Sequence, residues 1–448
     1  MYAKQSAVWS RLALGALSSA LGSAMSVSLL AAVPVQAVQA QTLPACAAAW
    51  TATTVYTGGN TASENGVNYH ANWWTQGDDP ATHNGGSGSG QPWTSQGSCG
   101  GSGSGGGTGG SGGTGGSGGT GGTGGTGGSG SASGLLFSPY KDVTINLDWN
   151  TNIMRTAVTG TPIPVVGSGS LVATAEPNLG AITLAFASGE CGSESWGGIP
   201  GASFASANIP ALNSAGVNYV VSTGGQAGTF TCGSSAGMAQ FLSRYMSPHM
   251  VGVDFDIEGG QTQAQINNLV SNAAYAHTLY PNLRFSFTLA TLAASDGSYG
   301  GLNGLGDMVV RAVQAANLPN YTINLMVMDF GSASPGVCVV ANGQCNMGQS
   351  AIQAALNLEH TYGIPASKIE LTPMIGVNDV SSEVFSSADV DTVVNYAASQ
   401  GMAGVHFWSL DRDTPCSGST GYASPTCNSV SGTTPLQYTN RFLQDLGR

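Results

Sequence analysis

The 448-residue sequence has few charged side chains. Only 8% of its residues are Asp, Glu, Lys or Arg, and just 11 are basic, which leaves a formal net charge of −12 at pH 7. So few cations are poorly suited to binding nucleic acid or an anionic membrane surface, and we predict neither as a partner. Gly, Ser and Thr are abundant instead. This composition favours an exported protein that acts on a neutral polymer.

Beyond its first 40 residues the sequence lacks any apolar run long enough to cross a bilayer. Residues 1–40 begin with Lys4 and Arg11, continue with apolar and small residues, and end in Val-Gln-Ala. This order is typical of a secretory signal peptide. A membrane anchor is the alternative, but repeated Gly, Ser and Ala in Gly15–Ser28 would make a poor spanning helix. We predict cleavage near Ala40 and a secreted, extracellular protein.

Metal-ligand spacings are missing as well. The 8 cysteines and 6 histidines include no Cys-x-x-Cys pair and no histidines at ligand spacing, so we predict no metal site. An even number of cysteines in an exported chain indicates disulfides. Their connectivity does not follow from sequence, and we choose neighbouring partners because each such pair closes a plausible local loop. The chosen pairs are Cys46–Cys99, Cys191–Cys232, Cys338–Cys345 and Cys416–Cys427.

Three acidic residues alternate with apolar ones in the segment 250–260. They are Asp254, Asp256 and Glu258. Successive side chains of a β-strand point to opposite faces, so this segment predicts a strand with one apolar face and one face of carboxylates. Like charges this close raise the pKa of at least one of them, and a raised carboxyl beside an ionised one can protonate a leaving oxygen at neutral pH.

A calcium-binding loop and an exposed acidic edge are the alternative interpretations of this segment. Calcium loops need turn residues between their ligands, whereas Val253, Phe255 and Ile257 favour a pleated, buried surface. We therefore interpret the segment as catalytic.

From Leu135 onward, short apolar runs alternate with helical patterns. The eight candidate strands are Asp142–Leu147, Ala181–Ala187, Val217–Thr223, Val251–Glu258, Leu283–Leu289, Thr322–Phe330, Ile369–Ile375 and Gly404–Ser409. Helical spacing predicts a helix in Ala264–Tyr280, and Ser387 and Gly401 mark the start and end of another. This alternation predicts an α/β fold, a (β/α)8 TIM barrel. An open, doubly wound sheet is the alternative, but no phosphate-binding glycine loop follows the first strand.

The segment 250–258 resembles the signature strand of glycoside hydrolase family 18, the chitinase family, usually written Asp-Gly-x-Asp-x-Asp-x-Glu. Gly252, Asp254, Asp256 and Glu258 match it, and Val251 stands where the family has its leading Asp. That Asp lies outside the three-carboxylate run. The resemblance therefore still implies the family's chemistry and leaves open how the Asp pair shares its proton.

Two further strand ends resemble the family, at the place where barrel active sites lie. Residues 222–225, Ser-Thr-Gly-Gly, resemble its Ser-x-Gly-Gly motif, and Gly224 and Gly225 permit close backbone approach. An ordinary strand-ending turn is the alternative. Trp408 matches the Trp at the floor of the cleaved sugar's subsite. Trp196 either lines the cleft or packs under its own loop.

The segment 326–330 resembles the family's Met-x-Tyr-Asp sequence. Met326 and Asp329 match it, and the resemblance implies that both contact substrate. Met328 stands where the family has the Tyr that binds the substrate's acetamido group, so that hydrogen bond must come from elsewhere or be missing.

The segment between Cys46 and Cys99 is aromatic-rich and resembles the chitin-binding modules of carbohydrate-binding families 5 and 12. The residues that match the sugar-stacking positions of these modules are Tyr56, Trp73 and Trp74. We interpret three other aromatic residues as core, namely Trp50, Tyr69 and Trp93. Residues 41–99 are therefore predicted to form a small all-β chitin-binding module.

Residues 100–134 are almost entirely Gly, Ser and Thr and cannot bury enough apolar surface to fold. We predict a flexible linker with an r.m.s. span of roughly 30–35 Å. The catalytic barrel then occupies residues 135–448.

The resemblances imply a chitinase that cleaves β-1,4-linked N-acetylglucosamine with retention, using the substrate's acetamido oxygen as nucleophile. Glu258 would be the general acid and then the base, Asp256 would orient the acetamido group, and Asp254 would share a proton with Asp256. We expect chitin and chito-oligosaccharides as partners, no cofactor, and a monomer. The alternatives are a non-catalytic chitin-binding or adhesion protein and an endo-β-N-acetylglucosaminidase acting on N-glycans or peptidoglycan.

Overall fold

A computed structural model of the chain describes residues 45–448 except 57–59, 73–74, 86–90, 100–133 and 419–420. The chain divides into two compact units, Met1–Gly124 and Gly125–Arg448. The predicted signal peptide, Trp73, Trp74 and nearly all of the predicted linker lie outside the described residues. The predicted domain boundaries therefore stay predictions.

The described part of the first unit contains a small antiparallel sheet. Its strands pair in the order β1 (Thr61–Glu64), β2 (Val67–Ala71) and β3 (Trp93–Ser98). Asn65 and Gly66 form the turn between β1 and β2 with φ of 51° and 75°, the conformation that Asn-Gly favours in hairpins. The Cys46–Cys99 disulfide joins the two ends of this unit, whose core is small.

The core of the first unit is aromatic. Trp93 is fully buried and Tyr69 is 6% exposed, which confirms both as core residues, and Trp50 packs partly buried against them. Tyr56 corrects a prediction, because it is only 7% exposed and its ring meets Trp93 edge-on with ring centres 4.9 Å apart. Its hydroxyl accepts a hydrogen bond from the Thr51 amide. A ring buried in this way has no open face on which a sugar could stack.

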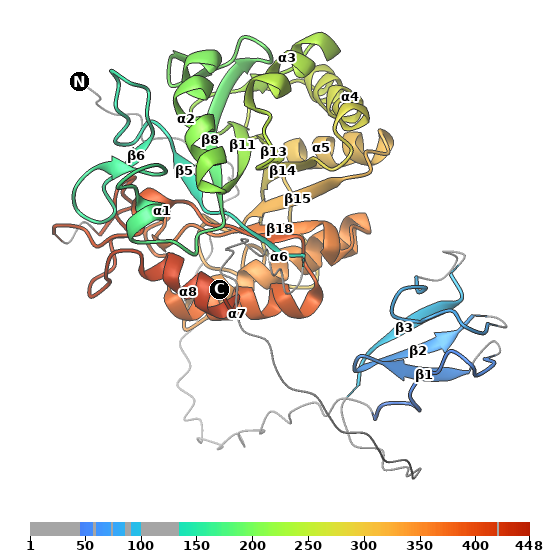
Figure 1. The fold of residues 1–448 in the computed structure, drawn as a ribbon. Coiled ribbons are helices and arrows are strands. Elements are labelled where there is room, and N and C mark those ends of the chain that lie inside the picture. Colours follow the sequence, from blue (N-terminus) through green and yellow to red (C-terminus); the bar gives the residue numbers. More distant parts are fainter. Residues whose placement is uncertain (1–44, 57–59, 73–74, 86–90, 100–133, 419–420) are drawn as a thin grey trace, which may run out of the picture. The chain divides into compact units, whose positions relative to one another are not determined.

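The second unit contains a ring of parallel strands surrounded by helices (Figure 1). In ring order the strands are Leu136–Phe137 (β4) continuing into Tyr140–Asp142 (β5), Ala181–Glu190 (β8), Asn218–Gly224 (β11), Met250–Asp256 (β13), Arg284–Ala290 (β14), Tyr321–Met326 (β15), Ile369–Thr372 (β18) and Gly404–Val405 (β21). β4 pairs with β21 and β5 pairs with β8, so the first segment closes the ring. The predicted (β/α)8 barrel is confirmed, and the open sheet is wrong.

Seven of the eight predicted strands are present, each starting within one residue of the predicted start. The first predicted strand, Asp142–Leu147, is wrong, because residues 143–146 form turns and the strand lies earlier. Asp142 Oδ1 accepts hydrogen bonds from the Thr144 amide at 2.9 Å and its hydroxyl at 2.7 Å, which turns the chain directly after β5. Val143 and Leu147 are buried within these turns, so their apolar alternation imitates a strand.

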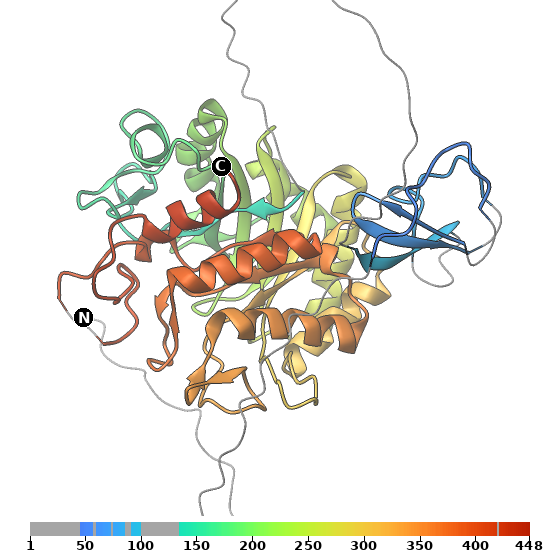
Figure 2. The ribbon, with the colours of Figure 1, turned by 90° about the horizontal axis from the view of Figure 1, so that it is seen from below.

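The helices are α1 (Leu171–Thr174), α2 (Gly201–Ala215), α3 (Ser235–Tyr245), α4 (Gln263–Leu279), α5 (Gly304–Ala315), α6 (Met347–Tyr362), α7 (Ser387–Gln400) and α8 (Gln437–Asp445). Both predicted helices are confirmed. α4 begins with a capping box between Thr262 and Gln265, and α7 ends at Gly401 with φ of 62°. α8 lies beside α7 on the outside of the ring (Figure 2).

Short elements lie in the loops of the second unit. They are β6 (Arg155–Thr156), β7 (Ile163–Pro164), β9 (Ser195–Trp196), β10 (Ile199–Pro200), β12 (Phe230–Thr231), β16 (Val340–Ala341), β17 (Gln344–Cys345), β19 (Gly376–Val377), β20 (Val384–Phe385) and the 3-10 helices η1 (Ala366–Lys368) and η2 (Leu410–Arg412). The other disulfides join Cys191–Cys232, Cys338–Cys345 and Cys416–Cys427, so the bonded pairs are those predicted. Within the described residues, no helix has the length and apolar character needed to pass through a membrane.

Candidate active site

The three predicted carboxylates lie together at the carboxyl end of β13. Asp254 and Asp256 are 1% and 5% exposed, whereas Glu258 lies two residues beyond the end of the strand and is exposed. The predicted alternation is present, because Phe255 and Ile257 between them are buried in the apolar core. One molecule bound above this strand could therefore meet Glu258 directly.

Four hydroxyl groups surround Asp254. Its Oδ2 accepts hydrogen bonds from Tyr140 at 2.9 Å and Ser222 at 2.5 Å, and its Oδ1 accepts from Ser286 at 2.7 Å and Thr288 at 2.6 Å. Burial raises the pKa of Asp254, and the four hydrogen bonds oppose that rise because each favours the ionised form. Asp254 is therefore the member of the aspartate pair that is better able to remain a carboxylate.

Asp256 has no such support. Its buried Oδ1 has no hydrogen-bond partner in the part of the chain that the structure describes. Burial, and then the negative charges of Glu258 and Asp254, raise the pKa of Asp256 well above its usual range. Of the two aspartates, Asp256 is therefore the one that binds a shared proton more readily.

Glu258 lies among further carboxylates. Loss of hydration between the surrounding loops raises the pKa of Glu258 to about 7, the charges of Asp329 and Asp379 add to the rise, and a backbone hydrogen bond from Gln226 opposes it. A carboxyl with such a pKa can donate and accept a proton at neutral pH. Of the three acidic residues on this strand, Glu258 is the exposed one and the one suited to proton transfer with a bound molecule.

Gly224 and Gly225 end β11 with φ of 87° and 77°, a conformation that glycine adopts at little cost. A Cβ atom on Gly224 would lie 2.1 Å from the backbone oxygen of Asp256, and one on Gly225 would lie 2.8 Å from the Phe186 ring. The Gly225 amide donates to that same Asp256 oxygen at 3.1 Å. The two glycines therefore bring β11 against β13 beside the carboxylates, and their predicted contact with substrate stays a prediction.

We expect Gly224→Ala to reduce stability and activity more than Gly401→Ala. Both residues have positive φ, 87° and 62°, so both substitutions carry a conformational cost of about 1–2 kcal/mol. A Cβ atom on Gly401 meets nothing within 4 Å, whereas one on Gly224 overlaps the backbone of Asp256. Thermal unfolding and initial rates of the two variants measure the difference. Equal losses in both would contradict a positioning role for Gly224.

Asp329 joins two loops beside Glu258. It has φ of 52°, and its Oδ1 accepts a hydrogen bond from the Val380 amide at 2.8 Å. The buried Glu383 accepts in return from the amides of Phe330 and Gly331 at 3.0 and 2.8 Å. The loops that follow β15 and β18 are thus held together by two carboxylates. The structure brings the predicted Asp329 into the site, where it organises backbone.

Trp408 lies in an aromatic group next to the carboxylates. Its ring stacks on Phe186 with ring centres 5.4 Å apart and an interplanar angle of 19°, and its centre is 6.2 Å from that of Tyr140. Since the Tyr140 hydroxyl donates to Asp254, this group contacts the carboxylates directly. Trp408 is partly exposed, as the predicted sugar platform requires. Met326, also partly exposed, is the last residue of β15.

Trp196 does not belong to this site. Its ring is fully buried and stacks on Phe204 with ring centres 4.2 Å apart, and its indole nitrogen donates to the Tyr245 hydroxyl at 2.8 Å. Of the two alternatives for Trp196, packing under its loop is therefore right.

Sequence patterns alone did not predict the polar residues that line the barrel around Asp254. They are Tyr140, Ser286, Thr288, Asn324 and Thr372. A signal for them exists, because Ser286 and Thr288 alternate with Phe residues in β14. Among the described residues, no group of three or more His, Cys, Asp or Glu could hold a metal ion.

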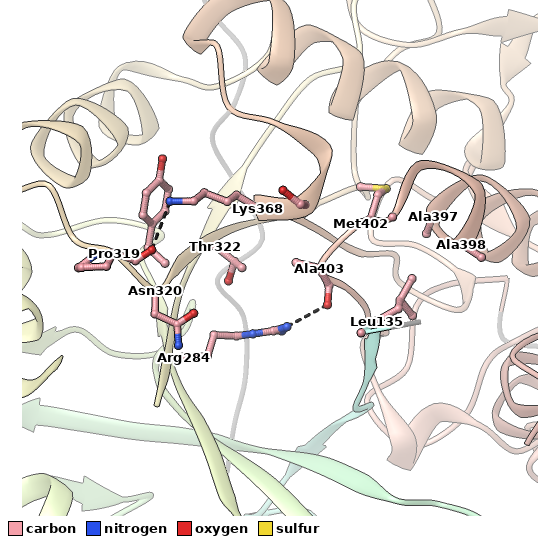
Figure 3. A pocket seen from close by; sticks show the side chains of 14 residues that line it. Leu135, Arg284, Pro319, Asn320, Thr322, Lys368, Ala397, Ala398, Met402 and Ala403 are labelled. Carbon is pink, nitrogen blue, oxygen red and sulfur yellow. Dashed lines mark hydrogen bonds between the residues drawn. The ribbon is translucent and has the colours of Figure 1, made fainter. Parts of the chain in front are cut away.

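A pocket of about 360 Å³ lies at the other end of the strands (Figure 3). Arg284 and Tyr321, the first residues of β14 and β15, line this pocket. Both of its cations are already engaged, since Lys368 donates to the Pro319 backbone oxygen and Arg284 donates to the Ala403 backbone oxygen and pairs with Glu370. The carboxylates stand at the opposite, carboxyl ends of the strands, where barrel active sites lie. The pocket is therefore separate from the candidate active site.

The fold and the site define a (β/α)8 barrel whose fourth strand presents an aspartate pair and an exposed acid. Residues 49–94 match the sequence model of carbohydrate-binding module family 5/12. Over 228 residues, 46% of its length, the chain is 29% identical to the "Probable bifunctional chitinase/lysozyme" of Escherichia coli (strain K12). It is 28% identical to "Endochitinase 11" of Metarhizium anisopliae, again over 228 residues and 46% of the chain.

The chain spans only 24% and 42% of the lengths of these two relatives. Among solved structures, catalytic-site mutants of active domain 2 of the chitinase from Pyrococcus furiosus match with a TM-score of 0.53 and 23% identity, over 71% of this chain and 97% of that chain. The chain thus combines a segment that matches carbohydrate-binding module family 5/12 with a barrel that has the fold of this chitinase domain.

Proposed function

We propose that this chain is a secreted chitinase, which hydrolyses the β-1,4 linkages between the N-acetylglucosamine residues of chitin and retains their configuration. The observation that carries the proposal is the difference between the three carboxylates of one strand. Asp254 is buried among four hydroxyl donors, the buried Oδ1 of Asp256 has no donor among the described residues, and Glu258 is exposed with a pKa raised to about 7. The names of both relatives and the family 5/12 match support chitin as the substrate.

In the proposed reaction, Glu258 donates its proton to the glycosidic oxygen as the bond to the anomeric carbon breaks. The substrate's own acetamido oxygen forms the new bond to that carbon and gives an oxazolinium-like intermediate. Asp256 orients the acetamido group, and the charge of the Asp254–Asp256 pair offsets the positive charge of the intermediate. Water then attacks the anomeric carbon while Glu258, now a carboxylate, accepts its proton. This scheme requires neither a metal nor an organic cofactor.

The burial of both aspartates favours this scheme over direct attack by a side chain. Asp254 and Asp256 are 1% and 5% exposed, whereas Glu258 is exposed. A covalent glycosyl-enzyme would need a second carboxylate on the other side of the sugar, about 5 Å from the acid. Met328 lacks the hydroxyl of the usual acetamido-binding Tyr, so a different donor must serve the acetamido oxygen or the bond is absent.

The function is tested by comparing substrates for the purified chain. The substrates are chitohexaose, a high-mannose glycoprotein and peptidoglycan, and their relative rates distinguish a chitinase from an endo-β-N-acetylglucosaminidase. Peptidoglycan is included because the name of one relative contains the word lysozyme. Rapid NMR of the first products reports their anomeric form. Preferential cleavage of chitohexaose to β-anomers supports the proposal. Cleavage of only the other substrates would overturn it, and binding of chitin without any cleavage would indicate the non-catalytic alternative.

For the small unit we expect the double variant Trp73→Ala, Trp74→Ala to lose affinity for insoluble chitin and keep its rate on soluble oligosaccharides. Both residues lie outside the described residues, and the burial of Tyr56 leaves them as the predicted stacking pair. Tyr56→Phe is the matched control, since it preserves the buried ring. Depletion by chitin beads and turnover of chitotetraose measure the two effects, and undiminished binding by the double variant would contradict the assignment.

Secretion and a monomeric state belong to the same proposal. The predicted signal peptide and the bonded cysteines support export, because disulfides persist in oxidising compartments. N-terminal sequencing of the protein in culture medium would locate the cleavage site. Light scattering of the mature protein would give its mass in solution.

A further inference from the structure

A buried amide stands behind the hydroxyl groups that bind Asp254. Asn324 on β15 is fully buried, and its side-chain nitrogen donates to the Tyr140 hydroxyl at 3.0 Å and to the Thr288 hydroxyl at 2.8 Å. Its side-chain oxygen accepts a hydrogen bond from the Thr372 hydroxyl at 2.8 Å. Both N–H groups and the oxygen of this amide are therefore hydrogen-bonded inside the barrel.

This arrangement decides where the hydroxyl protons go. The oxygens of Tyr140 and Thr288 are 3.2 Å apart, so either hydroxyl could donate to the other instead of to Asp254. Each hydroxyl has a single proton, and each already accepts one N–H of Asn324. With their oxygens occupied by these donors, both protons are best placed on Asp254, which lies 2.9 Å from Tyr140 and 2.6 Å from Thr288.

Asp254 and Thr372 together hold the Asn324 amide in one orientation. A side-chain amide can be turned over, which exchanges its donor and acceptor ends. An ionised carboxylate only accepts, so Tyr140 and Thr288 donate to Asp254 and accept from the nitrogen end of Asn324. The Thr372 hydroxyl, which can donate or accept, then donates to the oxygen end of the amide. In the reversed orientation the amide oxygen would draw the hydroxyl protons away from Asp254.

We propose that Asn324 is a positioning residue, which directs the protons of Tyr140 and Thr288 onto Asp254 and so keeps the negative charge of the aspartate pair on that residue. The inference deepens the proposed function, because the same pair serves the proposed reaction. Asn324 itself is too deep in the barrel to reach a substrate.

Other charged groups around the network are few. The titratable groups nearest the network include Tyr140 on β5, Asp256 and Glu258 at β13, Arg284 on β14, Glu370 on β18 and His406 directly after β21. Lys141 on β5 pairs with Asp411 instead. Arg284 pairs with Glu370, so these two charges compensate each other, and His406 Nε2 lies 3.4 Å from Glu370. β8 and β11 add the hydroxyls of Thr183 and Ser222. Asp256 is therefore the charged neighbour whose protonation is most directly coupled to Asp254.

The test follows the titration of the aspartate pair in the full chain. In Asn324→Leu, the Tyr140 and Thr288 hydroxyls can bond each other instead of Asp254. In Thr372→Val, the oxygen end of the Asn324 amide loses its donor, so the amide can turn over. Each variant therefore weakens the hydrogen bonds to Asp254. We expect the acid limb of kcat/KM on chitotetraose to move up by on the order of one pH unit in Asn324→Leu and by less in Thr372→Val. The alkaline limb, which reports Glu258, should not move, and Thr372→Ser should restore the acid limb.

A second measurement separates this inference from the proposed function. Carbon-13 NMR titration of Asp carboxyls in a Glu258→Gln background gives the same shift without any turnover, even if chitin is not the substrate. Asn357→Leu is the matched control, because Asn357 is a buried amide that bonds the Ala294 and Gly300 carbonyls away from the barrel interior. The inference would be overturned if the Asn324→Leu and Thr372→Val proteins fold and their Asp carboxyls titrate at the same pH as in the parent. If Asn324→Leu fails to fold, the Thr372 pair of variants decides alone.

Discussion

Replacing Glu258 with Gln is expected to lower kcat on chito-oligosaccharides by at least about 10²–10⁴-fold. The amide keeps the shape of the side chain but has no acidic proton for the glycosidic oxygen. Folding should be unaffected, because Glu258 is exposed and its side chain bonds no buried group among the described residues. Steady-state rates on chitotetraose and thermal unfolding together check this expectation.

Glu359→Gln on the outer helix α6 is the matched control for Glu258→Gln, since burial also raises the pKa of Glu359. It should retain the parent rate. A Glu258→Gln protein with near-parent turnover would refute the assignment of the acid.

The same assignment sets the alkaline side of the pH profile. Glu258 must be protonated to act as an acid, and its pKa is raised to about 7, so kcat/KM should persist below this pH and fall as the pH rises through it. Asp379→Asn removes one charge that raises the pKa of Glu258 and should move the fall to lower pH. A fall that stays in place in this variant would argue against Glu258 as the titrating group.

Asp256→Asn is expected to cost about 10²–10⁴-fold in kcat while leaving the melting temperature nearly unchanged. An amide cannot ionise, so it can neither exchange the proton of the pair nor take up negative charge as an oxazolinium-like intermediate forms. Stability should survive, because the buried Oδ1 of Asp256 has no partner to lose among the described residues. Rates on chitotetraose and differential scanning calorimetry measure both quantities.

Asp413→Asn gives the contrasting result for a structural carboxylate. Asp413 is fully buried and accepts hydrogen bonds from the amides of Tyr438 and Thr439 and from the Thr439 hydroxyl. Its substitution should lower the melting temperature and leave the rate per folded molecule intact. If Asp256→Asn behaved in this way instead, Asp256 would be a structural residue.

The fourth strand of the barrel was predicted well from sequence, because a single pattern of residues indicates both its secondary structure and its acidic face. The alternation of Asp254, Asp256 and Glu258 with apolar residues reports both the strand and the face that carries the acids. Gly224 and Gly225 were also found, since glycine-rich strand ends indicate close backbone approach. These features are local, and local features can be inferred from one chain.

Other features depend on contacts between distant residues. The donors to Asp254 come from residues 32 to 114 positions away in the chain, and the Tyr140–Thr288 contact spans 148 positions. No short motif encodes such a ring of hydroxyls. The first strand was misplaced because an Asx turn at Asp142 overrides the alternation that follows it. Tyr56 was misjudged because the first unit needs its ring for a core.

The two ends of the barrel unit meet at one place. The Arg448 guanidinium donates to the backbone oxygen of Leu135 at 3.1 Å, directly before β4 begins. Leu135 lines the pocket at the amino ends of the strands, the face turned away from the carboxylates. A short peptide could therefore join residue 448 to residue 135, and new termini could be opened in an outer loop. Such circular permutants offer a way to move the attachment point of a fused domain around the barrel without rebuilding the catalytic face.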